Sequence, residues 1–192
     1  MHPPAAPTVA AALYGAWRLL RFDPDGLQAF RADAEAFWQS FFAAIIALPG
    51  YAILVGLHLG GQDTAADWAS TVVLHGLAYV MSWTAFPLIT YYASLNMDRA
   101  ANWIGFVVAL NWSKVLQMAI YLPLVLVANT GVFGQAGGGF LTLVGFVAVI
   151  VYQWFVTRAA LDCPGASAAG LTAVDVILGL LITTMTDSAI AN

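Results

Sequence analysis

The run VALNWSKVLQMAIYLPL, residues 108–124, decides the fold, because it is apolar at both ends and carries a lysine near its centre. An apolar run of this kind is typical of a helix that spans a lipid bilayer. A lysine at the centre of such a helix costs about 2.5–3.5 kcal/mol on insertion scales, so it should avoid lipid. On a helix, Asn111, Lys114 and Gln117 fall within an arc of about 120° that also holds Met118 and Tyr121. We therefore predict that this polar face points into a helix bundle.

The composition indicates a membrane protein. The chain has 192 residues, of which 61% are hydrophobic and 8% are charged, and its mean hydropathy is +0.83. Soluble domains have about 45–50% apolar and about 25% charged residues. So few charges cannot cover a water-facing surface, and most of the outside must face lipid. The net charge of −4 and the six basic residues argue against a nucleic-acid partner, which requires clustered lysine and arginine.

Five stretches are long and apolar enough to cross a bilayer, which takes about 20 residues of helix. We predict an all-α integral membrane bundle of five transmembrane helices, over residues 37–59, 68–94, 102–128, 139–161 and 168–186. The segments between them are rich in glycine, asparagine and aspartate, which is typical of turns. The transmembrane domain then covers residues 37–188, and a cytoplasmic N-terminal segment covers residues 1–36.

The arginines indicate how the bundle is oriented. Arg18, Arg21 and Arg31 precede the first predicted span. Arg99 lies in the second connection, and Arg158 lies at the end of the fourth span. With five spans these arginines fall on one side of the membrane, and an even number of spans would break the alternation. Because connections rich in basic residues face the cytoplasm, we predict that the N-terminus is inside and the C-terminus outside.

We expect the N-terminal segment to form an amphipathic helix on the inner membrane face. Val9, Leu13, Trp17 and Leu20 recur at helical spacing, and a tryptophan on such a helix suits the headgroup level. The segment FDPDG, residues 22–26, should end the helix. A disordered tail is the alternative, because short helices are marginal without a surface to lie on. No basic region precedes the apolar stretch, so we expect no cleavable signal peptide.

A lysine inside the membrane requires a partner, and Asp175 on the fifth span is the best intramembrane candidate. Its helix face carries small and hydroxyl residues, which is typical of helix packing in lipid. We predict that the third and fifth spans touch and that Lys114 pairs with Asp175. Asn111, Gln117 and Gln153 complete the predicted intramembrane polar cluster. The pair could fix the helix register, or it could lie on a transport or proton route; alternatively, Lys114 could extend to the inner headgroups.

The sequence predicts no enzyme activity, no cofactor and no metal site. The motifs H-E-x-x-H and G-x-S-x-G are absent. Zinc needs three or four ligands at short spacings, and His58 and His75 are far from such a cluster. We expect His75 to be hydrogen-bonded in the bundle and His58 to lie at the membrane interface. Cys163 is the single cysteine, and we expect a free thiol on a short loop.

Three segments resemble the Yip1-like family of five-span membrane proteins. They are the lead-in FWQSFFAAIIALP, the third span ALNWSKVLQMAIYLP, and the last unit YQWFVTRAALDCPGASAAGLTAVDVILGLLI. The resemblance covers roughly residues 36–188 and implies a cytoplasmic N-terminal segment, five closely spaced helices and an outer C-terminus. The acidic-Leu-x-Gly-Pro motif of the eukaryotic relatives is absent, so binding of small GTPases is not carried over. A composition rich in alanine and glycine with almost no lysine indicates a bacterial inner (plasma) membrane.

Three functions follow as hypotheses. The first is a non-enzymatic multi-pass protein that acts by binding lipids or a membrane-protein partner, including a second copy of itself. The second is a small-solute or ion transporter or channel that uses Lys114 and Asp175. The third is an accessory subunit of a larger membrane complex.

Overall fold

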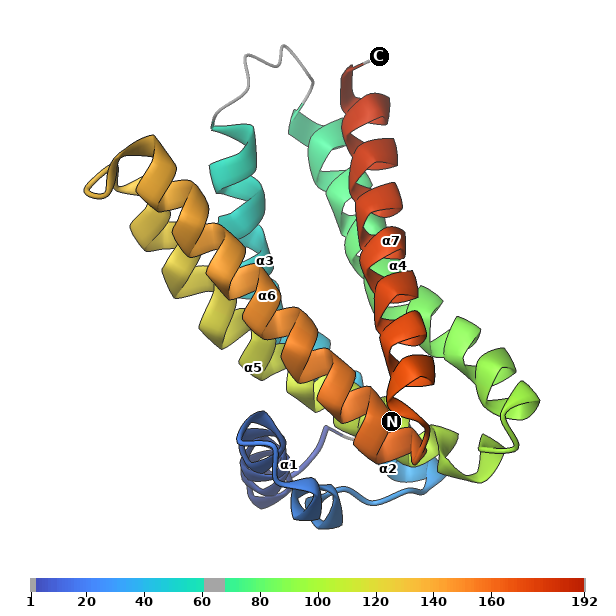
Figure 1. The fold of residues 1–192 in the computed structure, drawn as a ribbon. Helices are drawn as coiled ribbons and strands as arrows, with labels where there is room; N and C mark the ends of the chain where they lie inside the picture. The colour runs from blue at the N-terminus through green and yellow to red at the C-terminus, as the bar shows by residue number, and fades with distance from the viewer. Residues whose placement is uncertain (1–2, 61–67, 192) are drawn as a thin grey trace.

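The computed structural model describes residues 3–60 and 68–191, which form helices and contain no strand (Figure 1). Within this part of the chain, five helices are long and apolar enough to cross a membrane, which confirms the predicted all-α bundle. In chain order the elements are α1 (Ala6–Leu20), η1 (Pro24–Ala29), α2 (Ala34–Ser40), α3 (Phe42–Leu59), α4 (Trp68–Asn96), η2 (Ala100–Asn102), α5 (Trp103–Asn129), α6 (Gly134–Leu161) and α7 (Gly165–Ala191).

The predicted spans correspond to α3 through α7, and α7 extends beyond the predicted fifth span at both ends. The start of the first span belongs to the separate helix α2. Asp33 is the N-cap residue of this helix, and its side chain accepts a hydrogen bond from the backbone N–H of Ala36 at 2.9 Å. Helix α6 begins at Gly134, five residues before the predicted start, so most of the glycine-rich segment is helical. Together α2 and α3 form the first candidate span, Ala34–Leu59.

Two glycines of α6, Gly138 and Gly145, let this helix approach α5 closely. A Cβ at Gly138 would lie 2.9 Å from the carbonyl oxygen of Ala128, and one at Gly145 would lie 2.9 Å from Leu124 Cδ1. Close backbone approach at small residues is a common way for helices to pack in lipid. Among the glycines predicted as a turn, Gly138 therefore belongs to the α5–α6 interface.

The five long helices form two arms that diverge (Figure 1). Helices α3, α5 and α6 pack into one arm, and α4 and α7 pack into the other. The arms meet where α6 leads into α7, near α1, and they separate toward the end where α7 terminates. We call these the α1 end and the diverging end of the bundle.

Helix α1 lies across the α1 end and packs against α5 and α6 (Figure 1). It buries Ala12, Ala16 and Leu19. Tyr152 on α6 donates a hydrogen bond from its hydroxyl to the carbonyl of Ala16 at 2.8 Å. Trp17, which was expected at the headgroup level, is 50% exposed, whereas the face of α1 that packs on the bundle consists mainly of small residues. Small side chains dominate because α1 packs on protein at this face and must approach closely.

An ion pair stabilises the turn after α1. The guanidinium of Arg18 donates to the carboxylate of Asp23, with Nε 2.6 Å from Oδ2. This hydrogen bond lowers the pKa of Asp23, so the carboxylate stays ionised at neutral pH. The segment FDPDG ends α1 as predicted, and Phe22 there has a left-handed φ of 60°.

We predict that Ala16→Leu weakens the docking of α1, because Ala16 is fully buried and a larger side chain would overpack the contact. Overpacking of this kind costs about 1–3 kcal/mol. Trypsin should then cleave after Arg18 and Arg21 faster than in the natural protein. Ala10→Leu, at an exposed position of the same helix, is the matched control and should change little. Equal cleavage rates for both variants would contradict this packing.

Candidate functional site

Lys114 lies in the middle of α5 and reaches across to the other arm. Its ammonium Nζ donates a hydrogen bond to the backbone carbonyl of Ser82 on α4 at 3.0 Å. The same nitrogen lies 5.2 Å from the centre of the Trp83 ring, a cation–π distance. Pro87 lies one turn further along α4 and lacks the N–H that would bond the carbonyl of Trp83, which favours a bend at this level. The lysine therefore contacts α4 close to its internal proline.

Asp175 lies on α7 and accepts its hydrogen bond from a glutamine, not from the lysine. Gln153 Nε2 on α6 donates to Asp175 Oδ2 at 2.5 Å. Gln153 Oε1 in turn accepts from Gln117 Nε2 on α5 at 3.1 Å. This relay connects three helices through side chains that the sequence placed in one cluster.

The predicted direct ion pair between Lys114 and Asp175 is not formed. Among the described residues, no ion pair includes either side chain. The prediction failed because α5 and α7 each pack mainly on other helices, so Gln153 on α6 comes between the two charges. The carboxylate of Asp175 still acts on Lys114 electrostatically across this gap.

Asn111 is separate from the other four members of the predicted cluster. It is fully buried and donates from Nδ2 to Ser40 Oγ on α2 at 2.9 Å. Helix α5 is buried on all sides from Phe106 to Ser113. One turn before Lys114, the same face of α5 therefore contacts α2. Helical spacing predicted the shared face, but it could not show that two different helices cover that face.

Two adjoining cavities flank the relay. A cavity of about 370 Å³ is lined by Lys114, Gln117 and Ser82, among other side chains from α3 to α6. A second cavity of about 250 Å³ is lined by Gln117, Gln153 and Asp175. Gln117, Phe146 and Val149 line both cavities, so the two adjoin along α5 and α6.

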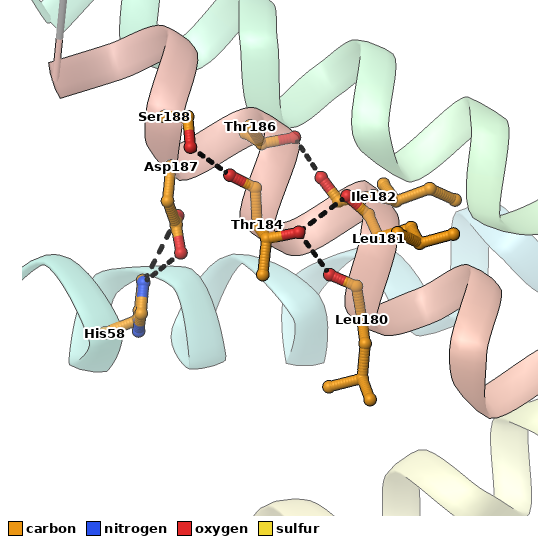
Figure 2. A network of polar contacts seen from close by, with 8 residues as sticks. All are labelled: His58, Leu180, Leu181, Ile182, Thr184, Thr186, Asp187 and Ser188. Atoms are coloured by element: carbon orange, nitrogen blue, oxygen red, sulfur yellow. Dashed lines mark hydrogen bonds and ion pairs between the residues drawn. The ribbon is translucent and has the colours of Figure 1, made fainter.

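A third cavity continues toward the diverging end. It has a volume of about 230 Å³, and it shares Tyr51 and Ser82 with the lysine cavity. His58 on α3 and Asp187 on α7 line its far part, with Nε2 3.3 Å from both carboxylate oxygens (Figure 2). The single hydroxyl of neighbouring Thr184 lies within hydrogen-bond distance of the carbonyls of Leu180 and Leu181 in α7 itself (Figure 2). The His58–Asp187 contact therefore joins the two arms where they diverge.

Sequence reasoning missed two tyrosines that also join the arms. The hydroxyl of Tyr79 on α4 donates to the carbonyl of Ala44 on α3 at 2.6 Å. The hydroxyl of Tyr51 on α3 donates to the carbonyl of His75 on α4 at 3.3 Å. The signal was available, because a phenol inside a membrane needs an acceptor. The expected hydrogen bond of the His75 ring is not seen, since its Nε2 is buried without a partner in the described part of the chain.

Neither metal nor thiol chemistry has support at this site. Within residues 3–60 and 68–191, no group of three histidine, cysteine, aspartate or glutamate side chains could hold a metal ion. Cys163 is free and buried in the connection between α6 and α7. Burial raises the pKa of its thiol, so it stays protonated and unreactive at neutral pH.

Comparison with protein-family models, with curated proteins and with solved structures finds no match. The class of the protein therefore follows from its own architecture. Five apolar helices of spanning length define a multi-pass membrane protein whose apolar outer surface suits contact with lipid.

We predict that Tyr79→Phe loosens the two arms, because it removes the hydroxyl that bonds Ala44 across them. Hydrogen bonds between membrane helices contribute about 0.6 kcal/mol on average and up to about 1.7. The free energy of unfolding in detergent should fall by about this amount, which lowers the midpoint of the unfolding transition. Tyr92→Phe, on the exposed face of the same helix, is the control. A midpoint lowered equally by both variants would show that the Tyr79 hydroxyl does not join the arms.

Proposed function

We propose that this protein binds a membrane lipid between its two arms, at Lys114. One observation carries the proposal: the lysine lines a cavity of about 370 Å³ and has no carboxylate in ion-pair contact within the described residues. Ligand cavities in proteins are commonly about 300–1,000 Å³. The proposed function is non-enzymatic, because the features that support it, a charged side chain and a cavity, serve binding.

The bonding of the Lys114 ammonium leaves capacity for a ligand. An ammonium has three N–H donors, and the described residues provide one acceptor, the carbonyl of Ser82. The ring of Trp83 stabilises the charge from one side. A charge inside a membrane is costly unless it is paired, so an anionic group in the cavity would lower the free energy of this site.

The rest of the lysine cavity favours an amphiphile over an inorganic ion. Met118, Phe146 and Val149 add apolar side chains to a lining that also contains Ser82 and Lys114. A charged group together with apolar side chains suits a molecule with a charged head and hydrocarbon chains. A lipid also has a direct route to a cavity that lies between membrane helices, because it already occupies the surrounding bilayer.

The cellular setting is part of the same proposal. The arginines support an N-terminus in the cytoplasm and a C-terminus outside. The composition, with one lysine in 192 residues, supports a bacterial inner membrane. The order of segments supports a Yip1-like protein, and the exposed apolar helix faces leave room for a membrane-protein partner or a second copy.

We predict that Lys114→Met reduces the lipid that stays with the purified protein by about tenfold or more, since a charge-assisted hydrogen bond is worth about that factor. Native mass spectrometry after mild detergent extraction measures the bound lipid. Arg21→Met removes an exposed basic residue outside the cavity and is the control. Equal retention by the natural protein and Lys114→Met would contradict the proposed function.

Transport of a small solute is the second candidate function. The observation that favours it is the series of three cavities joined by shared lining residues, from Asp175 past Lys114 to His58 and Asp187. Binding sites near the membrane midplane between helix groups are typical of transporters. A transporter must open its site to water, and lipid binding alone does not require this.

We predict for the transport candidate that Thr183→Cys, in the third cavity, reacts with a charged, membrane-impermeant thiol reagent added from the C-terminal side. Cys163→Ser provides the background, so that the new thiol is the single one. Ile177→Cys is the control, because that residue is 55% exposed on the apolar surface and should lie in lipid. If Thr183→Cys reacts no faster than Ile177→Cys, the cavities are closed to water and the transport candidate fails.

A further inference from the structure

Two opposite charges lie in adjoining cavities without touching. Lys114 lines the first cavity and Asp175 lines the second, and Gln117 lines both. The relay from Gln117 through Gln153 to Asp175 fills the space where a direct ion pair was expected. Each charge is thus held by neutral groups and stays separated from the other.

Both charges keep bonding capacity for a ligand. Within the described residues, Lys114 donates to one carbonyl, that of Ser82, and Asp175 accepts from one amide, that of Gln153, at Oδ2. A carboxylate has about four acceptor positions on its two oxygens, so most of those on Asp175 remain. One cavity therefore suits an anionic group, and the neighbouring cavity suits a hydrogen-bond donor with positive charge.

The charge balance of the site favours a ligand with no net charge. Lys114 and Asp175 together sum to zero, so a purely anionic ligand would leave a net negative charge inside the membrane. A net charge there costs several kcal/mol. A zwitterion adds none, and its two ends can lie opposite the two protein charges.

We propose, resting on the proposed function of lipid binding, that the ligand is a zwitterion. Its phosphate or carboxylate lies at Lys114, and its primary ammonium lies at Asp175, with Gln117 between them. Phosphatidylethanolamine in the bilayer and a free amino acid both carry this chemistry. The ammonium must be primary, because Asp175 and the oxygens near it accept N–H donors, which a trimethylated nitrogen lacks.

Lipid selectivity in nanodiscs tests the proposal. The natural protein should retain phosphatidylethanolamine about tenfold or more over phosphatidylcholine and over phosphatidylglycerol, the factor that one charge-assisted hydrogen bond gives. Asp175→Asn should abolish the preference over phosphatidylglycerol while the protein still binds an anionic lipid. Lys114→Met should lose binding of all three lipids. Asp98→Asn, at an exposed loop position with a left-handed φ of 56°, is the matched control and should keep the preference.

A second experiment, with water-soluble ligands, distinguishes the two sources of the zwitterion. Titration with L-alanine and with sn-glycero-3-phosphoethanolamine, neither of which has a net charge at neutral pH, in lipid-free detergent micelles asks whether a free molecule binds without hydrocarbon chains. Binding there that Asp175→Asn abolishes would assign the site to a free zwitterion. Retention of phosphatidylethanolamine without such binding would assign the site to the lipid. Both results support a zwitterion at this site, and binding of the free zwitterion without retained lipid would overturn the proposed function of lipid binding.

The comparison of lipids in the natural protein keeps the test valid where a variant fails to fold. Equal retention of phosphatidylethanolamine, phosphatidylcholine and phosphatidylglycerol would overturn the zwitterion while leaving lipid binding intact. A preference for phosphatidylglycerol would also overturn the zwitterion and leave lipid binding intact. Absence of any bound lipid or soluble zwitterion in the natural protein would overturn the proposed function as well.

Discussion

The bond from the Lys114 ammonium to the carbonyl of Ser82 is the interaction on which the rest of the site depends. It places the one lysine of the chain between two helix arms, where a charge is costly unless something in the structure compensates it. The ring of Trp83 and the more distant carboxylate of Asp175 compensate it in part. A ligand in the cavity beside Lys114 would complete the stabilisation of this charge.

The contacts between the arms explain how such a cavity persists in a small protein. Polar side chains join the two arms at three places: Tyr79 to Ala44, Tyr51 to His75, and His58 to Asp187. These contacts are made by side chains that reach across from one arm to the other, whereas Gly138 and Gly145 let the α6 backbone approach α5 closely. The same bundle therefore has a closely packed arm and an interface between arms that leaves space. Domain-scale motion of one arm against the other is the type of change that opens such interfaces in transporters.

Much of the fold could be predicted from the sequence, because apolar length and charge scarcity leave few alternatives in a membrane. The contacts within the site were harder to predict from the sequence. The spacing of Lys114 and Gln117 correctly placed both on one face, yet it could not show that α2 covers the neighbouring Asn111. The position of Asp175 along its helix correctly placed it in the same cluster as Lys114. Which helices are neighbours depends on packing, however, and Gln153 on α6 bonds Asp175 in place of Lys114. The buried face of α1 was also missed, because close packing there selects alanine over larger apolar residues.

The central claim is that Lys114 contacts a bound molecule and does not form an ion pair with Asp175. Since the chain has a single lysine, labelling with [15Nζ]lysine gives one side-chain signal in solid-state nuclear magnetic resonance. In bilayers of phosphatidylethanolamine this account predicts that lipid phosphorus dephases the Lys114 signal, which reports direct contact with the headgroup. Dephasing by 13C-labelled aspartate carboxylate in place of lipid phosphorus would show a closed Lys114–Asp175 pair and contradict the account.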